Sequence, residues 1–457
     1  MIYIKRFTKH EDYESYIASS GYVCPNVSFC NDVENEVHYN PCPPPPHDYS
    51  QDYLTFIPEE DCTFNFSGYT TANTLSYSID NGETWTSLER NVDTPTITSG
   101  VPVLWKGMCT PNSNGIGIFS STGRFTVEGN VMSLLYGDEY IGETSLSEKA
   151  YAFYCLFCRC TGITSAEHMS LPATTLAHNC YQSMFTSCTS LTTAPALPAT
   201  TLDFGCYRNM FYNCMSLTTA PELPATTLAE GCYQNMFYNC KSLINAPSIL
   251  PASTMDASAY TSMFQGCTSL VTAPELPATT LSSSCYYCMF QDCTNLTTPP
   301  SRIPATTMAV SAFTSMFSGC TSLATAPELP ATTLANYCYR YMFQGCTSLT
   351  TAPELPATTL YSGCYQQMFQ HCENLTTAPE LPATTLVYRC YSGMFQQCNK
   401  LNYIKALFTT TPGSDNTSYW VNGVASSGTF VKNSAATWSV TGKSGIPNGW
   451  TVETASA

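Results

Sequence analysis

A unit of about 26 residues repeats from about residue 150 to residue 408, and this repeat constrains the fold more than any other feature. Nine copies contain a Met-Phe pair, and their phenylalanines recur every 26 or 27 residues: Phe185, Phe211, Phe237, Phe264, Phe290, Phe317, Phe343, Phe369 and Phe395. An earlier, divergent copy is centred on Phe157. One such unit cannot bury its own apolar face, so we expect the copies to stack into a solenoid.

Each copy is expected to contain a short helix followed by a short strand. In CYQNMFYNC, residues 232–240, the apolar side chains stand at i, i+1, i+4, i+5 and i+8, which is one face of a helix with 3.6 residues per turn. The segment from Leu243 to Ala246 ends at Pro247, and we expect it to pair with the equivalent segment of the next copy.

The two cysteines of each copy are predicted to be packing residues. Eight residues apart on a helix, they would lie about 12 Å from each other, which is too far for a disulfide within the copy. Ala259 and Ala312 replace the first cysteine in two copies, and alanine can replace a small filler but not a metal ligand or a nucleophile. A free cysteine packs as a small hydrophobe. Whether thiols of neighbouring copies oxidise outside the cell stays open.

The remaining cysteine groups do not predict a metal site. Cys155, Cys158 and Cys160 are close in sequence, as are Cys285 and Cys288. A structural zinc site needs about four ligands, and no histidine pair at suitable spacing accompanies either group. We therefore expect no metal and no cofactor.

Catalytic constellations are also missing from the sequence. The histidines are scattered, and no G-x-S-x-G, H-E-x-x-H or phosphate-binding loop occurs. One glutamate per copy forms a row of like charges, for which a solvated or weakly cation-binding edge is the expectation: Glu222, Glu275, Glu328, Glu354 and Glu380. We expect no enzyme; a catalytic site in the β-rich part before the repeats is the minor alternative.

Composition excludes some partners. The formal net charge is −16 and only 11% of the residues are charged, so there is no cationic cluster for nucleic acid or an anionic membrane. No run approaches about 18 apolar residues, so no membrane insertion is expected. The opening residues lack the apolar core of a signal peptide, and the cysteine count is odd at 25, so we expect cytosolic folding with mostly free thiols.

The overall prediction is an α+β repeat solenoid with flanking domains. Residues 1–40 resemble a small β-α-β unit, and PCPPPPH at 41–47 is a stiff linker. Residues 48–145 alternate apolar and polar, with a hairpin signal at Asp80-Asn81-Gly82, which predicts a β-sandwich. The solenoid covers 146–408, and a β-rich cap with three tryptophans covers 409–457.

Three short windows vary between copies while the framework stays constant. They lie before the first cysteine, before the methionine and after the phenylalanine, and they favour Tyr, Asn, Ser, Gly, Gln and Arg, as binding loops do. The alternative is simple drift of exposed positions. The candidate ligand-binding residues are Arg208, Asn209, Tyr212, Asn213, Gln234, Asn235, Tyr238, Arg340, Tyr341, Gln366, Gln367, Gln370, His371, Tyr388 and Arg389. Constant Thr-Thr pairs such as Thr218-Thr219 are a second candidate surface, for glycans.

The repeat resembles the BspA-like leucine-rich repeats. CYQNMFYNCKSL and MFQGCTSLTTAPELPATTL carry the likeness, with a Cys three residues after the Phe and a Leu three residues later. The pairs Ala312-Phe313 and Ala152-Phe153 match the Ala-Phe of that family. The resemblance implies parallel strands in a curved solenoid, and adhesion or binding without catalysis. The copies are a few residues longer than is usual in the family.

The flanks resemble segments of modular surface or virion proteins from Bacteroides-group bacteria and their tailed, crAss-like phages. VCPNVSFCNDVENEVHYNP, GRFTVEGNVMSLLYGD and the C-terminal WVNGVASSGTF carry this likeness. It implies a virion surface protein, such as a tail or head fibre, made in the host cytoplasm. Its N-terminal module would attach to other virion proteins, its solenoid would bind a host glycan or protein, and a fibre would be a homotrimer. A bacterial cell-surface adhesin is the alternative.

Overall fold

The computed structural model describes residues 47–68 and 74–455. The predicted β-α-β module at 1–40 and all but the last residue of the linker at 41–47 lie outside the described residues. The chain divides into two compact units, Met1–Tyr49 and Ser50–Ala457, and the second contains all the described strands.

Two β-sheets open the second unit. The larger one has six strands in the order β4-β3-β5-β1-β7-β8. Its strands are β1 (Leu54–Pro58), β3 (Leu75–Ser78), β4 (Thr86–Leu88), β5 (Val103–Gly107), β7 (Phe125–Asn130) and β8 (Ile163–Ser170). The smaller sheet pairs β2 (Phe64–Gly68) with β6 (Gly117–Ser121). Three short helices accompany the sheets: η1 (Tyr49–Gln51), α2 (Ser133–Tyr136) and η2 (Gly137–Glu139).

An aromatic core lies between these two sheets. The ring of Phe56 on β1 is 5.3 Å from Phe64 on β2 and 4.9 Å from Phe119 on β6. Strands β1, β2, β5 and β7 follow the burial alternation expected from the sequence, because successive side chains of a strand point to opposite faces. The hairpin β3–β4 is confirmed, and Asn81 and Gly82 both have positive φ. The segment GRFTVEGNVMSLLYG, within the part of the chain predicted to be β-rich, is a strand only in its first half, since its second half forms α2.

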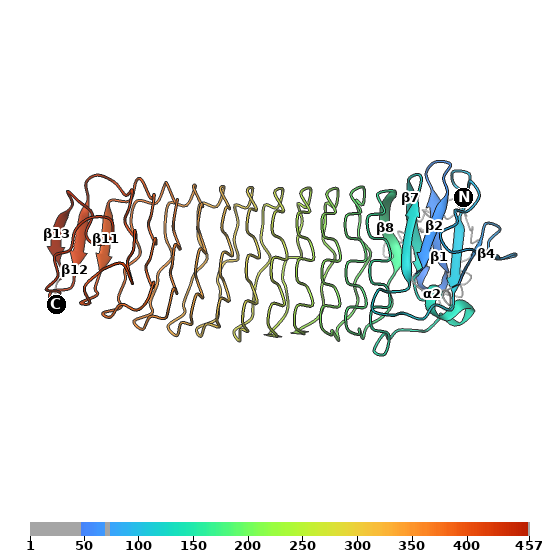
Figure 1. Ribbon diagram of the computed structural model, residues 1–457, viewed down its shortest axis with the longest axis horizontal. Coiled ribbons are helices and arrows are strands. Elements are labelled where there is room, and N and C mark those ends of the chain that lie inside the picture. Colours follow the sequence, from blue (N-terminus) through green and yellow to red (C-terminus); the bar gives the residue numbers. More distant parts are fainter. Residues whose placement is uncertain (1–46, 69–73, 456–457) are drawn as a thin grey trace, which may run out of the picture. The chain divides into compact units, whose positions relative to one another are not determined.

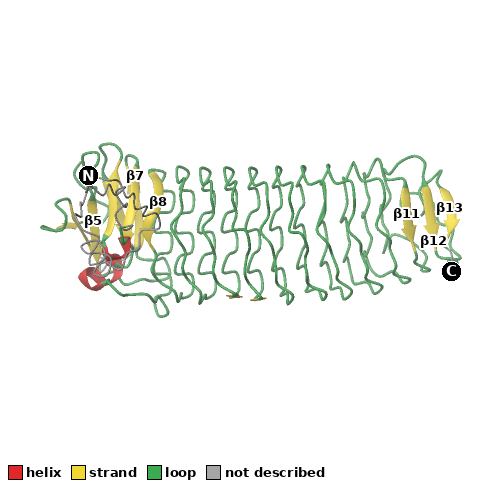
Figure 2. Ribbon diagram, turned by 180° about the vertical axis from the view of Figure 1, so that it is seen from behind, coloured by secondary structure: helices red, strands yellow, loops and turns green. Residues whose placement is uncertain are grey.

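The repeats form coils that follow one another in a single row within this unit (Figure 1). Apart from the two-residue strands β9 (Thr227–Leu228) and β10 (Thr254–Met255), strands occur only at the two ends of the row (Figure 2). The predicted helix in each copy is wrong: the segment from one cysteine to the next is a run of turns. In the described residues the α content is therefore one short helix, α2.

Backbone hydrogen bonds explain why these segments are not helical. The Met210 N–H donates to Tyr207 C=O within the coil (3.1 Å), which closes a β-turn. The Tyr207 and Phe211 N–H groups instead donate to the next coil, to Cys232 C=O (3.0 Å) and Met236 C=O (2.9 Å). The same alternation recurs along the row, so every second N–H joins neighbouring coils. In an α-helix, all of these N–H groups would donate to carbonyls of the same segment, and none would be left to join neighbouring coils.

The burial pattern of the turns has a period of four residues. Side chains at i, i+1, i+4, i+5 and i+8 are inside, as in Cys206, Tyr207, Met210, Phe211 and Cys214, which are all at most 1% exposed. Over eight residues, periods of 3.6 and 4 select nearly the same positions, which is why the apolar pattern alone indicated a helix.

The predicted strand after the second cysteine is reduced to single parallel bridges. One series runs from β7 and β8 through the pairs Ser165–Thr193, Thr193–Thr219 and Thr219–Asn245. Prolines such as Pro221 and Pro247 follow directly, and proline has no N–H to extend the pairing. Because β8 belongs to both the six-stranded sheet and this series, the sheet passes into the coils without a break.

Stacked aromatic rings fill the centre of the row. The phenylalanines from Phe157 to Phe395 lie 5.4 to 5.8 Å apart with nearly parallel rings. The column from Phe153 to Tyr391 stacks beside it, at 5.3 to 5.9 Å. Phe119 of β6 stacks on Phe157 at 5.7 Å, so the β-rich part closes one end of the column.

The last residues close the other end. β11 (Tyr403–Ala406), β12 (Thr429–Lys432) and β13 (Thr451–Thr454) form a parallel sheet. The fully buried Trp420 covers the last rings of the two columns, with its ring centroid 6.2 Å from Phe395 and 6.3 Å from Tyr391. It stands at the methionine position of the next coil: its C=O accepts from Phe395 N–H (2.8 Å), and its indole N–H donates to Gly445 C=O (2.9 Å). In the described residues, no helix is long and apolar enough to cross a membrane.

The column of rings from Phe153 to Tyr391, which is mostly tyrosine, provides a test of stability. The hydroxyls of five tyrosines are buried without a protein hydrogen-bond partner: Tyr181, Tyr207, Tyr233, Tyr260 and Tyr339. A buried hydroxyl without a partner is unfavourable, and Phe153 and Phe313 already occupy this column. We expect Tyr233→Phe to leave the free energy of unfolding unchanged or raise it by up to about 1 kcal/mol. Phe237→Ala in the same coil should lower it by about 3–5 kcal/mol. Urea unfolding followed by circular dichroism measures both; a clear loss for Tyr233→Phe would contradict the packing described.

Candidate functional site

The outward-facing side chains of the turns form one continuous surface, called the ladder face below. It consists, in each coil, of the pair before the methionine, the pair after the phenylalanine and the two residues before the first cysteine. In the coil of Cys206 these are 204–205, 208–209 and 212–213. They alternate with the fully buried apolar pairs, so every coil has the same six positions. Their exposed fractions differ widely, from 7% in Gln366 and 8% in Gln370 to 51% in Tyr388.

Backbone conformation restricts which residue types fit at half of these positions. The second residue of each pair has positive φ, near 57° in Gly205, Asn209 and Asn213. Gly, Asn and Asp adopt this left-handed region more readily than most residues do, which accounts for much of their frequency in the variable windows. Ser is also frequent there, as in Ser183 and Ser262. The recurrence of these residue types at every fourth position is the signal in the sequence that indicates turns instead of a helix. Bulky residues at such positions are the exceptions: Tyr151, Arg159, Tyr337, Tyr341, Gln367, His371, Arg389 and Gln397.

The structure gathers the fifteen predicted site residues into two clusters on this face. The Tyr–Asn cluster spans two neighbouring coils: Arg208, Asn209, Tyr212, Asn213, Gln234, Asn235 and Tyr238. The Arg–Gln cluster spans three: Arg340, Tyr341, Gln366, Gln367, Gln370, His371, Tyr388 and Arg389. Four coil steps of about 5 Å separate the clusters, or roughly 20 Å. Not all the predicted residues therefore belong to one site.

Side chains of the Tyr–Asn cluster contact their counterparts in the next coil. The rings of Tyr212 and Tyr238 are parallel and 4.8 Å apart. The Asn235 side-chain amide donates to Asn209 Oδ1 (3.1 Å). The ring faces of the two tyrosines cover each other, so their edges and hydroxyls remain for a ligand.

The Arg–Gln cluster begins with an arginine held between tyrosines. Arg340 Nη2 donates to the Tyr341 hydroxyl (2.8 Å), and the guanidinium lies 4.5 Å from the Tyr341 ring and 5.6 Å from the Tyr337 ring. Such cation–π contacts stabilise the guanidinium position. At the other edge, the Arg389 guanidinium lies 5.0 Å from the ring of Tyr388, which is 51% exposed.

Glutamine amides connect the coils of the Arg–Gln cluster. Gln344 Nε2 donates to Gln370 Oε1 (2.6 Å), and Gln370 Nε2 donates to Gln396 Oε1 (3.0 Å). Gln367 Nε2 also donates to Gln370 Oε1 (2.8 Å). Amide ladders of this kind hold each side chain in one orientation, so the cluster is ordered before any ligand binds.

Among the members of this surface that sequence reasoning missed are Tyr287, Tyr337 and Gln344. Tyr287 is 38% exposed, and the neighbouring Cys288 thiol is the main cause that raises its pKa. All three stand at ladder-face positions, so alignment of the copies by their cysteines would have found them.

The repeat thiols are interior, as predicted, and the second cysteine of each copy has a hydrogen-bonding role. Cys214 Sγ lies 3.1 Å from Phe185 C=O of the preceding coil, and Cys240 Sγ lies 3.0 Å from Phe211 C=O. This contact recurs from Cys188 to Cys398. The first cysteine makes no comparable short bond, which explains why Ala259 and Ala312 replace only that one. Burial raises the pKa of these thiols, to about 12 in Cys206.

The described residues, 47–68 and 74–455, contain no group of three or more His, Cys, Asp or Glu side chains placed to hold a metal ion. The row of glutamates is partly paired: Glu380 contacts Lys405 (2.9 Å), Glu328 contacts Arg302 (3.7 Å), and Glu275 accepts from Ser301. All these contacts are exposed and contribute little to stability.

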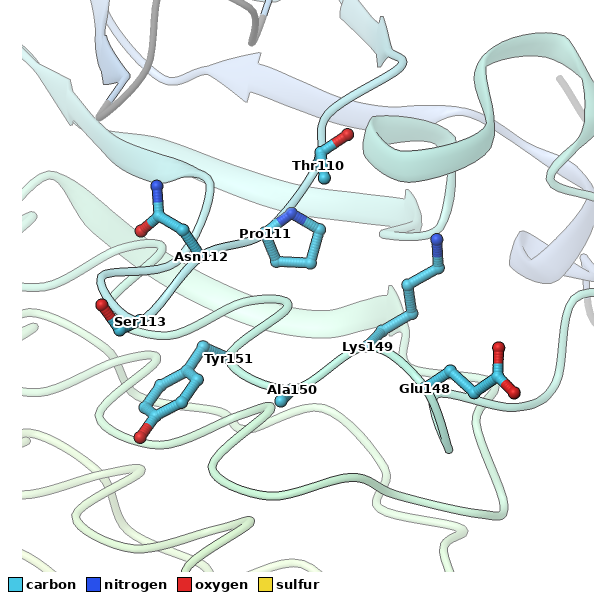
Figure 3. A pocket seen from close by; sticks show the side chains of 8 residues that line it. All are labelled: Thr110, Pro111, Asn112, Ser113, Glu148, Lys149, Ala150 and Tyr151. Carbon is cyan, nitrogen blue, oxygen red and sulfur yellow. The ribbon is translucent and has the colours of Figure 1, made fainter.

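A pocket lies where the β-rich part meets the first coil (Figure 3). Its lining comes from two segments, the loop Thr110–Ser113 and the stretch Glu148–Tyr151. Figure 3 shows Asn112 and Ser113 on the side of Tyr151, and Glu148 and Lys149 on the other side. The Lys149 ammonium lies 5.4 Å from the Tyr136 ring. This lining does not form a nucleophile–base pair.

Comparison with known proteins identifies the family to which the repeats belong. Three overlapping stretches, residues 149–297, 234–352 and 289–415, match the family model described as a BspA type leucine rich repeat region in six copies. Together they cover residues 149–415, more than half of the chain. The chain belongs to this family. No curated protein matches the sequence.

Three solved structures of leucine-rich repeat proteins resemble this BspA-type chain. The protein from Bacteroides ovatus is 15% identical, with a TM-score of 0.28, covering 62% of this chain and 82% of its own. The T. pallidum protein is 20% identical, with a TM-score of 0.29, covering 47% and 86%. The Eubacterium ventriosum protein is 13% identical, with a TM-score of 0.28, covering 66% and 90%.

The two cysteine columns of the BspA-type repeats can be compared directly. Cys232 and Cys240 belong to one coil and are both fully buried. We expect Cys240→Ala to lower the free energy of unfolding by about 0.5–1.5 kcal/mol more than Cys232→Ala, because only the former loses a hydrogen bond to Phe211 C=O. Urea midpoints of the two variants under reducing conditions measure the difference. Equal losses would show that the thiol contact contributes nothing.

Proposed function

We propose that this protein is a non-enzymatic binding protein whose ladder face contacts a glycan or protein ligand of a host envelope or of the gut. The observation that carries the proposal is the two clusters of tyrosine, arginine, asparagine and glutamine side chains on a backbone fixed by hydrogen bonds between coils. Side chains ordered in advance lose little entropy when a ligand binds.

The chemistry of the face favours a polar ligand with a repeating structure. Polar side chains recur along the face, with amides and tyrosine hydroxyls concentrated in the two clusters, and within the described residues these clusters carry three arginines and no carboxylate: Arg208, Arg340 and Arg389. A polymer lying along the row would meet an equivalent hydrogen-bonding position about every 5 Å. An extended glycan chain has this character, and we infer that it is the ligand class.

In this proposal, the constant interior holds the coils together and the variable ladder face determines which ligand binds. Inward positions hardly differ between copies, because the stacked rings tolerate few shapes. The ladder face differs from coil to coil, so the identity of the ligand would depend on which coils it touches. Specificity would then lie in the two clusters and not in the coils between them.

The location of the protein, on a virion or on a bacterial cell, is a separate part of the proposal. The resemblance of the flanks to phage and Bacteroides-group surface proteins supports a virion fibre attached through its N-terminal module, with a bacterial surface adhesin as the alternative. Peptide mass spectrometry of purified particles should detect the protein in the first case. Proteolysis of intact cells should release it in the second.

A glycan array with the purified full chain tests the ligand class. We expect binding to one group of related glycans, and at least a tenfold loss for Tyr212→Ala combined with Tyr238→Ala, or for Arg340→Ala combined with Gln370→Ala. These positions are chosen because their φ is not positive, so alanine adds no backbone strain.

Gln265→Ala is the matched control. Gln265 occupies the same ladder-face position as Tyr238 in a coil between the clusters, so its loss should leave binding within twofold. Equal losses in all three variants, or undiminished binding by both cluster variants, would contradict the assignment of binding to the two clusters.

A further inference from the structure

The first coil has two thiols on its ladder face, which distinguishes it from every other coil of the row. Cys155 precedes the buried pair Leu156-Phe157, and Cys158 follows it. Both are half-buried, unlike the fully buried thiols of the repeat columns. Their sulfur atoms are 2.7 Å apart. Other coils have pairs such as Asn209 and Tyr212 at these two positions.

The backbone already holds the two cysteines in a geometry that suits a disulfide. Cys158 N–H donates to Cys155 C=O (3.0 Å), so the two residues begin and end one β-turn. The ends of such a turn have Cα atoms within about 7 Å, which overlaps the range of about 4.4–6.8 Å found for disulfides. Two further N–H groups fix the turn to the next coil. The Cys155 N–H donates to Gln182 C=O (3.0 Å), and the Arg159 N–H donates to Thr186 C=O (2.8 Å). Closing the bond therefore needs a sulfur movement of less than 1 Å towards the bond length of about 2.05 Å.

The two thiols differ in reactivity. Hydrogen bonding from Cys158 is the main cause that lowers the pKa of Cys155, and the Arg159 charge acts in the same direction. The same hydrogen bond, with burial, raises the pKa of Cys158. Because the thiolate is the nucleophile in thiol–disulfide exchange, Cys155 is the attacking thiol and Cys158 the resolving one.

We propose that Cys155 and Cys158 form a reversible dithiol–disulfide site that exchanges with low-molecular-weight disulfides. The Cys155 thiolate attacks one sulfur of the small disulfide, a mixed disulfide forms, and one thiolate leaves. The Cys158 thiolate then attacks Cys155 Sγ, the protein disulfide forms, and the second thiolate leaves. Two protein thiols are oxidised, one small disulfide is reduced to two thiols, and the two protons pass to the leaving thiolates.

This site is independent of the ligand-binding clusters, because it lies on the coil that joins the β-rich part. Phe119 N–H of β6 donates to Leu156 C=O (2.8 Å), within the Cys155–Cys158 turn. The new bond closes a loop of only four residues whose backbone is already fixed, so it should change stability little. Cys288 provides an internal comparison: it stands at the position of Cys155 in another coil, with Gln291 at the position of Cys158.

Glutathione is the probe for the test. The full chain is equilibrated under native conditions with reduced and oxidised glutathione, quenched with acid, alkylated in denaturant and digested with trypsin. Cleavage after Lys149 and Arg159 releases residues 150–159, which contain Cys155 and Cys158 and no other cysteine. We expect this peptide to escape alkylation and to be two hydrogens lighter than the dithiol, and to become alkylated at both sites after reduction.

Cys158→Ser separates exchange at one thiol from formation of the internal bond. It should leave Cys155 as a mixed disulfide with glutathione, whereas Cys288 should remain alkylatable in both proteins. Near-ultraviolet circular dichroism shows whether the variant is folded. The proposal fails if the wild-type peptide is alkylated at both cysteines at every glutathione ratio, or if it carries two glutathiones instead of the internal bond.

Discussion

The bond from every second N–H of a turn to a carbonyl of the next coil is the interaction on which the rest of the structure depends. It divides the donors of each segment equally, half closing turns within a coil and half joining coils. The division requires positive φ at every fourth residue, and this requirement selects Asn and Gly there. It also fixes the step between coils, so that identical side chains meet their counterparts.

The interior follows from that step. Rings of equal shape stack at 5.4 to 5.8 Å only because the copies are in register, and the second cysteine of each copy reaches a carbonyl of the preceding coil for the same reason. Such an interior has open ends, and two different structures close them. At one end β6 supplies Phe119, and at the other Trp420 covers the last rings, Tyr391 and Phe395. The second unit therefore has one continuous core with two dissimilar caps.

On the exterior, the same register brings polar side chains of neighbouring coils into contact. Polar side chains that would be mobile on an isolated turn are held by their counterparts, as in the Gln344–Gln370–Gln396 ladder. A face of this kind has ordered hydrogen-bonding groups without a deep cavity. Adhesive proteins that bind extended polymers need such a surface, whereas catalysis needs groups that converge on one point. The pair Cys155 and Cys158 shows that a single turn can nevertheless bring two reactive groups together.

The sequence by itself determined the repeat, the family, the interior role of the cysteines and most strands before the repeats. Period and composition are local properties, so they can be read directly from one chain. The helix prediction failed because the apolar residues in 232–240 fit periods of 3.6 and 4 equally well, and only bonding to a neighbouring coil decides between them. The sequence likewise selected the ladder-face residues but not their division into two clusters, nor the partners Tyr337 and Gln344. Those depend on which copies are adjacent in space, and adjacency between coils exists only once the chain has stacked.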